Sequence, residues 1–533
     1  MDAEAVKALN KNWKTTCKII FGEEVGELSD FKDWLSEFVD PIRTWKSSRS
    51  GRDVPFAIPY YSESSKRISF EEIELENKFE PLSINELKDI DSISEAVTER
   101  AYYTGGIVLG NSKGIVGSTS VNDSFYVLDS SFISESKYVA YTSFLRYSES
   151  VFGVNNDVKS NFLIRGFNPG EITRGCEVWD CYFCSDIYFS LGCIDSRDCM
   201  FSFNLSGKSN TIGNFELEKG KYLQIKKDLL RQMADELRRN KRLPSLLELV
   251  GKPHHDEEAF AIIRERAEIE EDTSDKKPIE NSFSETTKVI FRKPLARIDD
   301  YEKWLMENVR GSWTEKSAIS GRPIIVADMI PGKFYPEDRL VKRAEALKSG
   351  EILKLGKEEA ETINLGNAKE RLGKIAYFYT ELRLKKNFNV IDTAMSYNAM
   401  HCYKGALLSN VKYSAFSFWP RNSQHIYGSN TSFSCSSCIN TYFSNNISRS
   451  FEIDCSNKCS GSHFLHNCEN VNDSMFCFNV KNLKNAIGNA TLPPDKFQKI
   501  RSSILEQIHS ELEAKKSLKS NIYDISSVGR KKS

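Results

Sequence analysis

Cysteine and histidine residues gather in parts of the chain where they could bind a metal. The sequence has 13 cysteines and seven histidines, with Cys-x-x-Cys pairs at Cys181–Cys184 and Cys435–Cys438. Thiolate and imidazole are the ligands that zinc prefers. The set best spaced for one ion is Cys459, His463, His466 and Cys468. The first cysteine-rich tract has no histidine, so a site of this kind common to both tracts is excluded.

A structural role for the cysteines is the favoured interpretation. Residues i and i+3 of a regular strand point to opposite faces, and both Cys-x-x-Cys pairs lie among strand-like residues. Small thiols stacked in a β core explain the clusters without an ion. We therefore expect no metal and no other cofactor, and the Cys/His set is the alternative.

Acidic residues between 180 and 198 could support cleavage of a polysaccharide. Paired carboxylates act as general acid and base in glycosidases. The candidates are Asp186, Asp195 and Asp198 for catalysis and Trp179 and Tyr182 for stacking on a sugar. A lyase would instead need calcium-binding acids and a base such as Arg174 or Arg197. Aspartates that simply form turns explain the same residues, so the enzyme is the alternative function.

Two Lys-Ser-x-x-Ser-Gly-Arg segments carry hydroxyls and cations that could hold an anion. One runs from Lys46 to Arg52 and the other from Lys316 to Arg322. A phosphate or carboxylate suits such groups, but the spacing is not that of a nucleotide-binding P-loop. We favour a Ser-Gly turn between two short strands, with the cations in water.

The paired features reflect a tandem duplication. In what we call the leading alignment, 30–54 matches 300–324 without a gap, and in the closing alignment 198–237 matches 473–512 in the same way. Each half then contains a leading segment, an insert, a tract rich in Ser, Asn, Cys and aromatic residues, and an amphipathic helix.

The tracts 105–214 and 387–489 are expected to form many short strands. Their apolar runs are separated by Ser, Asn, Asp and Gly, and proline is almost absent. Aromatic positions such as Tyr126 and Tyr138 recur at gaps of about 10 to 14 residues, and two such steps suggest a coil of roughly 22 to 26 residues. The sequence thus predicts a mainly β fold with helical caps, built from two tandem parallel β-solenoid (β-helix) modules. A propeller or sandwich is disfavoured.

One apolar stripe marks the helix that closes each half. Its residues are Tyr222, Ile225 and Leu229 in the first half and Phe497, Ile500, Ile504 and Ile508 in the second. Steps of three and four residues place them on one helical face. We expect each helix to cover the end of a solenoid, with self-association through the stripe as the alternative. Trp34 and Trp304 are expected to anchor leading caps against the first coil.

Both tracts resemble right-handed parallel β-helix proteins. The endings DCMFSFN and DSMFCFN, which lead through IGN into KYLQIKKDLL and KFQKIRSSIL, are similar to a duplicated, functionally uncharacterised group of solenoid proteins from microbial and viral genomes. The resemblance implies a solenoid fold and brings no activity with it.

These patterns divide the chain into eight segments. They are a leading cap at 1–104, a solenoid at 105–214, a closing helix at 215–250, a charged linker at 251–289, a second leading cap with a helical insert at 290–386, a solenoid at 387–489, a closing helix at 490–516 and a flexible tail at 517–533.

Composition narrows the function. With 73 basic and 74 acidic side chains, the chain has no net field to attract nucleic acid. We find no signal peptide or membrane span in the sequence, and expect a cytoplasmic protein or a virion component. The prediction is a non-enzymatic structural or binding protein, which forms a homo-oligomer or presents a long face to a glycan or protein partner. A polysaccharide lyase or glycoside hydrolase is the alternative.

Overall fold

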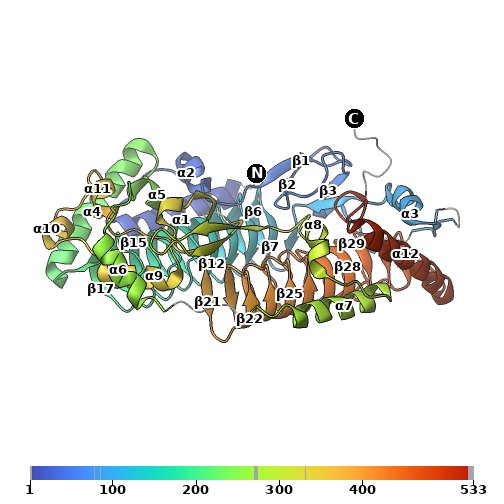
Figure 1. Ribbon diagram of the computed structural model, residues 1–533. Helices are drawn as coiled ribbons and strands as arrows, with labels where there is room; N and C mark the ends of the chain where they lie inside the picture. The colour runs from blue at the N-terminus through green and yellow to red at the C-terminus, as the bar shows by residue number, and fades with distance from the viewer. Residues whose placement is uncertain (1–2, 77–78, 84–85, 269–273, 330–331, 526–533) are drawn as a thin grey trace.

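The computed structural model describes residues 3–76, 79–83, 86–268, 274–329 and 332–525. It is mainly β, and most of its strands belong to one sheet of 14 strands and another of 12. Figure 1 shows the large sheets as two rows of strands, with helices lying over their faces and ends.

The first half begins with helical and hairpin segments and continues into the 14-stranded sheet. Its α-helices are α1 (Ala3–Phe21), α2 (Lys32–Ser36), α3 (Ile90–Val97), α4 (Lys219–Asn240) and α5 (Leu246–Leu249). The strands outside the large sheet are β1 (Arg43–Lys46), β2 (Asp53–Phe56), β3 (Arg67–Ser69) and β4 (Tyr103–Gly105). The 14-stranded sheet comprises β5 (Val108–Leu109), β6 (Lys113–Val116), β7 (Thr119–Asn122), β8 (Phe125–Leu128), β9 (Ser131–Ser134), β10 (Lys137–Ala140), β11 (Ser143–Arg146), β12 (Glu149–Val158), β13 (Asn161–Phe167), β14 (Thr173–Trp179), β15 (Ser185–Leu191), β16 (Arg197–Met200), β17 (Ser209–Ile212) and β18 (Phe215–Glu216).

The second half repeats this order with a different insert. Helix α6 (Glu257–Arg266) precedes the second half. The helices of the second half are α7 (Lys277–Phe291), α8 (Glu302–Leu305), α9 (Arg343–Ile352), α10 (Lys357–Glu361), α11 (Ala368–Leu372) and α12 (Pro494–Lys515). The hairpin strands are β19 (Ser312–Lys316) and β20 (Pro323–Ala327). The 12-stranded sheet comprises β21 (Leu382–Leu384), β22 (Phe388–Ile391), β23 (Met395–Tyr397), β24 (Met400–Tyr403), β25 (Leu408–Ala415), β26 (Arg421–Tyr427), β27 (Ser436–Tyr442), β28 (Ser448–Asp454), β29 (His463–His466), β30 (Met475–Phe478), β31 (Ala486–Ile487) and β32 (Ala490–Thr491).

In most strand pairs of both large sheets, each residue pairs in parallel with the residue twelve positions further along the chain. The first pairs, β5–β7 and β21–β23, are offset by thirteen residues, and the last pairs, β17–β18 and β31–β32, are antiparallel. Asn161 pairs with Thr173 and Thr173 with Ser185, in parallel, and the second sheet pairs Ser436 with Ser448 in the same way. The predicted repeat of roughly 22 to 26 residues is therefore wrong, because paired residues on neighbouring strands are twelve positions apart. A single step between aromatic positions already completes the period, as the stacked rings of Tyr126 and Tyr138 show.

A three-residue backbone pattern underlies this register. Almost every third residue of the strand regions has a positive φ, including Asp123, Tyr126 and Asp129. The residue that follows each one points inward, so Ser124, Val127 and Ser130 are buried. Asn, Asp and Gly tolerate the left-handed region best, which explains their abundance. Since inward positions recur every three residues, both members of a Cys-x-x-Cys pair face the same interior, and our opposite-face argument does not hold.

Small hydroxyl side chains fill much of this interior and pair its backbone. The Ser136 hydroxyl donates to the Ser134 carbonyl at 2.7 Å and accepts the Ser148 N–H at 3.1 Å. Ser148 in turn accepts the N–H of Ser160 at 3.0 Å. A buried hydroxyl is tolerated only when it is hydrogen-bonded, and these hydroxyls connect one strand to the next.

The cysteines of the Cys-x-x-Cys pairs occupy such inward positions. Cys184 Sγ lies 3.1 Å from the Tyr182 carbonyl and accepts the Ser196 N–H at 3.4 Å. Burial raises the pKa of Cys184 and of Cys438 to about 12. These thiols therefore remain protonated and replace serine in the interior.

The helices that close each half are buried through the predicted stripe. Tyr222, Leu229, Phe497, Ile504 and Ile508 are at most 1% exposed. Helix α4 packs on β17 and α1, while α12 packs on α7. Ile225 is buried as well, and Ile500 is half-buried, so most of the stripe is covered within the chain.

Each half begins earlier than the aligned segments indicated. Helices α1 and α7 are followed by the same short helices and hairpin, and α7 lies along β24–β28 in Figure 1. The leading alignment extends back, still without a gap, to Thr16–Phe21 and Thr286–Phe291. Residues 277–291, most of which we assigned to a charged linker, form a helix whose Phe283 and Ile290 are buried.

Two further expectations differ from the structure. Within the segment predicted as a flexible tail, Ile522, Tyr523 and Ile525 are buried, while 526–533 lie outside the described residues. Trp34 lies in α2, which packs on β12 in the middle of its sheet, not on the first strands. Trp304 contacts Phe451 of β28, again far from the first strands.

Inserts cross between the halves. Tyr61 of the first half donates its hydroxyl to Asp454 at 3.1 Å, and Tyr335 of the second half donates to Asp180 at 3.0 Å. The large sheets also meet directly, since the Phe132 ring stacks on Phe443 at 5.4 Å. Each half therefore helps to hold the other in place.

Candidate functional site

Two of the three acids predicted for catalysis, Asp186 and Asp198, belong to a structural ion cluster. Lys226 of α4 lies 2.9 Å from Asp186 Oδ1 and 2.8 Å from Asp198 Oδ1. Arg174 makes two further bonds to Asp186, at 2.7 and 2.6 Å. Burial favours a raised pKa for Asp186, but the Arg174 and Lys226 bonds outweigh it and lower the pKa. Such a carboxylate is unsuited to donating a proton.

The remaining members of that predicted site point elsewhere. Trp179 is 1% exposed, so it offers no stacking surface. The Tyr182 hydroxyl accepts from Asn168 at 2.6 Å, beside the buried Asp180, whose pKa burial raises to about 6. Asp195 is exposed in a separate shallow depression. These residues do not converge on one groove.

Both Lys-Ser-x-x-Ser-Gly-Arg segments turn between the strands of a hairpin. Ser47 donates to Glu72 at 2.7 Å and Ser317 to Glu345 at 2.5 Å, and each hydroxyl also accepts N–H groups of its own turn. Lys46 pairs with Asp53 at the surface, and Arg52 is exposed. Lys316 is exposed as well, whereas Arg322 borders a cavity described below.

The predicted Cys/His metal set is divided between two environments. Cys459 and Cys468 face the interior of the second sheet region, where both thiols bond to backbone carbonyls. His463 is fully buried and pairs with Phe451 and Met475, which belong to a different apolar cluster. His466 pairs with Asp454 on the neighbouring strand. In the described part of the chain, the one group of three ligand atoms close enough for an ion is Asp454, Cys455 and His466.

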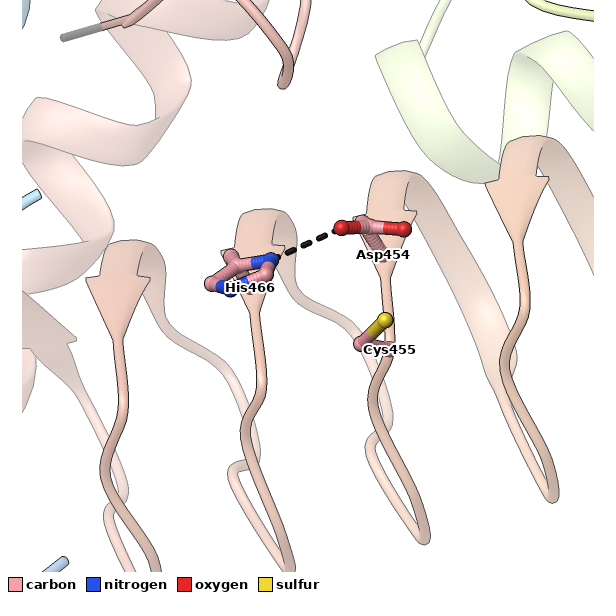
Figure 2. Close-up of side chains that lie close together, drawn as sticks. All are labelled: Asp454, Cys455 and His466. Atoms are coloured by element: carbon pink, nitrogen blue, oxygen red, sulfur yellow. Dashed lines mark hydrogen bonds and ion pairs between the residues drawn. The ribbon is translucent and has the colours of Figure 1, made fainter. Parts of the chain in front are cut away.

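That group resembles a catalytic or metal site, and Figure 2 shows its three side chains with the bond between His466 and Asp454. Other residues occupy the remaining hydrogen-bonding positions of His466 and Asp454. His466 Nδ1 lies 2.7 Å from Asp454 Oδ2, and His466 Nε2 accepts the backbone N–H of Thr104 at 2.9 Å. Tyr61 and Tyr523 donate to the two Asp454 oxygens at 3.1 and 3.0 Å. The histidine has no lone pair left for an ion or a substrate proton.

Cys455 is not an activated nucleophile. Loss of hydration and the nearby Asp454 carboxylate raise the pKa of its thiol well above the usual value. Reactive cysteines need the opposite shift, towards the thiolate. The cluster instead ties the first-half insert and the C-terminal segment to β28 and β29.

A large cavity beside the second hairpin is the best candidate for binding. Its volume is about 1510 Å³, and it lies between β19, β20, α9 and the first strands of the second large sheet. Trp313 of β19 lines it and is 37% exposed, an unusual degree for this side chain. A cavity of this size can bury several sugar rings or a compound of similar size.

Paired charges surround Trp313. Seven cationic and six acidic side chains line the cavity. Three ion pairs among them are Lys342–Glu381 at 3.0 Å, Lys348–Glu351 at 3.0 Å and Lys404–Glu302 at 2.7 Å. The walls thus offer hydrogen-bond donors and acceptors side by side, with little net charge.

Sequence reasoning identified Arg322 and a helical insert within 290–386, but it did not assign Trp313 or α9 to a binding site. The insert at 325–380 differs between the two halves, and this difference is the one signal in the sequence that pointed to the cavity. The other cavity residues come from segments far apart in the sequence, so no local motif brings them together. The chain gave no match to a protein-family model, a curated protein or a solved structure. Among the described residues, none of the helices combines the length and apolar character needed to cross a bilayer.

Proposed function

We propose that the two large sheets are parallel β-solenoids with a coil of twelve positions, similar to parallel β-helix proteins and closed by α4 and α12. The support is the parallel register of twelve residues that most strand pairs share, together with inward positions at every third residue. Four inward positions in each coil account for the narrow, serine-rich and cysteine-rich interiors. The duplicated solenoid then acts as a rigid support for the inserts.

On this support, we propose that the protein is a non-enzymatic saccharide-binding protein. The cavity around Trp313 carries the proposal. An exposed indole offers a flat apolar face, and neighbouring donors and acceptors suit hydroxyl groups, each of which both donates and accepts a hydrogen bond. A neutral polyhydroxylated ligand fits a wall of paired charges better than a strongly anionic or cationic one.

Binding without cleavage is the better interpretation of this cavity. Glu302, Glu351 and Glu381 each contact a lysine ammonium, so their oxygens already accept charge-assisted hydrogen bonds. Asp186 and Asp198, the predicted catalytic pair, lie on either side of Lys226 in the other half. The polysaccharide-active enzyme remains the alternative.

A glycan array probed with the full chain tests the proposal, followed by calorimetric titration of the best oligosaccharide. We expect Trp313→Ala to weaken binding about tenfold, because the stacking face is lost. Trp45→Ala is the matched control, since Trp45 lies on the equivalent hairpin, outside the cavity lining, and packs on Arg67 at 3.7 Å. Equal affinity of the wild type and Trp313→Ala would contradict the proposal. Release of reducing ends that Asp198→Asn abolishes would establish the enzyme.

A further inference from the structure

The two halves differ in charge at one equivalent place, next to the closing helices. The closing alignment, continued backwards without a gap, pairs Arg174 with Arg449, Asp198 with Asp473 and Lys226 with Arg501. It also pairs Asp186 with Gly461. Three charged positions are thus kept, while the fourth has lost its carboxylate.

In the first half the cluster is balanced. Two cations, Arg174 and Lys226, contact two carboxylates, Asp186 and Asp198. Asp186 is central, because its oxygens receive hydrogen bonds from both cations at 2.6 to 2.9 Å. Its side chain shows what these cations bind, namely an oxyanion held between an arginine on one strand and a cation on the closing helix.

In the second half the same positions carry excess positive charge. Arg501 contacts Asp473 at 3.1 Å, and Arg449 reaches only the Ser460 hydroxyl at 2.9 Å. Within the described ranges Arg449 forms no ion pair. A further cation, Arg292, stands opposite Gly22 in the leading alignment and is close enough to act on Arg501. Burial lowers the pKa of Arg501, and repulsion from Arg292 and Arg449 adds to this despite Asp473.

Unused hydrogen-bonding atoms lie at the same place. Arg501 Nε is buried and has no partner among the described residues. His463, which replaces Tyr188, is 0% exposed, and in the described structure neither ring nitrogen has a partner. Burial first and the Arg501 charge second lower the pKa of His463 well below its usual value. Orphaned buried donors of this kind are rare in folded proteins and call for a partner.

We propose that Arg449 and Arg501 form a binding site for a small oxyanion, a carboxylate or a phosphate, at the place that the Asp186 side chain fills in the first half. Gly461 has no side chain there, and the Asp473 carboxylate, whose Oδ1 lies 2.8 Å from where a Cβ of Gly461 would stand, borders the site. The Gly461 φ of 60° matches the 57° of Asp186, so the backbone supports the same arrangement with or without a carboxylate. The site is separate from the Trp313 cavity and does not depend on saccharide binding.

The test is calorimetric titration of the full chain with inorganic phosphate and, separately, with acetate, which shows whether the site prefers phosphate or carboxylate. We expect Arg449→Gln to weaken binding of the preferred anion about tenfold or more, since a charge-assisted bond is lost. Gly461→Asp supplies the carboxylate within the chain and should abolish binding. Its Cβ would lie 2.8 Å from Asp473 Oδ1, so that side chain must move slightly.

Three controls make the result decisive. Gly461→Ala imposes the same backbone strain without a carboxylate and should retain anion binding. Arg174→Gln changes the balanced cluster of the first half and should leave anion affinity unchanged, as should Trp313→Ala. Should neither anion bind at about 10 mM, or should Arg449→Gln bind as tightly as wild type, the proposal is overturned. Because Arg449 is exposed, its substitution tests the site even if Gly461→Asp fails to fold.

Discussion

Glu177 and Glu452 occupy equivalent positions in the two halves, and each receives the backbone N–H of a residue beyond a closing helix. Glu177 accepts from Leu246 at 3.1 Å, and Glu452 accepts from Ile522 at 2.7 Å. Arg165 pairs with Glu177, but Asn440 takes its place opposite Glu452. Burial without a counter-charge raises the pKa of Glu452 to about 8.

This difference predicts a pH dependence of stability. A carboxyl group with a raised pKa binds its proton more tightly in the folded protein, so its contribution falls as pH rises from about 4.5 to about 8. The slope is on the order of 1 kcal/mol per pH unit. We expect Glu452→Gln to make the free energy of unfolding, measured in urea at pH 5 and pH 8, less dependent on pH than in the wild type.

Glu177→Gln is the matched control for this experiment. It leaves Arg165, whose side chain is 3% exposed, without its buried partner, and should destabilise the protein at both pH values. An unchanged pH slope in Glu452→Gln would show that Glu452 is ionised throughout this range.

The hydrogen bonds of the Asp454–His466 group could not be predicted from the sequence, because several of its partners are distant in sequence. Asp454 and His466 are separated by one period of the register, so the correct period would have placed them on adjacent strands. Their other partners, Tyr61 and Thr104, come from the insert of the first half. No spacing rule indicates that Thr104 occupies His466 Nε2, and this bond is what argues against a metal site there.

Among the elements, the strands owe their pairing to inward hydroxyls as well as to their backbone. Ser136 accepts the N–H of Ser148 from within the interior and is 4% exposed. Its replacement by alanine removes a buried acceptor. We expect Ser136→Ala to cost about 1 to 3 kcal/mol in the free energy of unfolding, measured by denaturant titration.

An exposed ladder in the second half provides the comparison. Asn410 accepts from Asn398 at 2.9 Å and donates to Asn422 at 3.1 Å, and water can replace both bonds. Asn410→Gly keeps the left-handed φ of 54° without strain and should therefore change stability by less than about 0.5 kcal/mol. Equal costs for the two substitutions would mean that the inward hydroxyls do not hold the strands together.

The mainly β character of the tracts and the buried helical stripes could be predicted from local patterns. The period of the register could not be read correctly from aromatic residues, because their positions recur at irregular steps. Val127, Ser130 and Ile133 already show the pattern of one inward residue at every third position. Ordinary strands have inward residues at every second position, so a search for strands does not detect this pattern. Left-handed residues at every third position break that alternation.

At the scale of the whole molecule, the two halves of the duplication hold each other through their inserts. Each insert contacts the other half, through Tyr61 with Asp454 and through Tyr335 with Asp180. The duplication itself was predictable from gapless alignment. The cavity was not, since it depends on how α9 and the second hairpin pack around Trp313.

The saccharide-binding proposal places the ligand in a cavity and not along a sheet face. Exposed asparagine ladders, such as Asn398, Asn410 and Asn422, offer a regular surface that could bind a long glycan instead. Both surfaces belong to the second half, so binding alone does not separate them. The two surfaces can be distinguished by finding which strands and helices the ligand protects from exchange with solvent.

The most direct test is hydrogen–deuterium exchange of the full chain with and without the oligosaccharide that binds best. The account predicts slower exchange in β19, β20 and α9, which border the cavity around Trp313. Exchange in β25 and β26, where Asn410 and Asn422 lie, should remain unchanged. Protection confined to those strands, with none at β19 or α9, would contradict the cavity as the binding site.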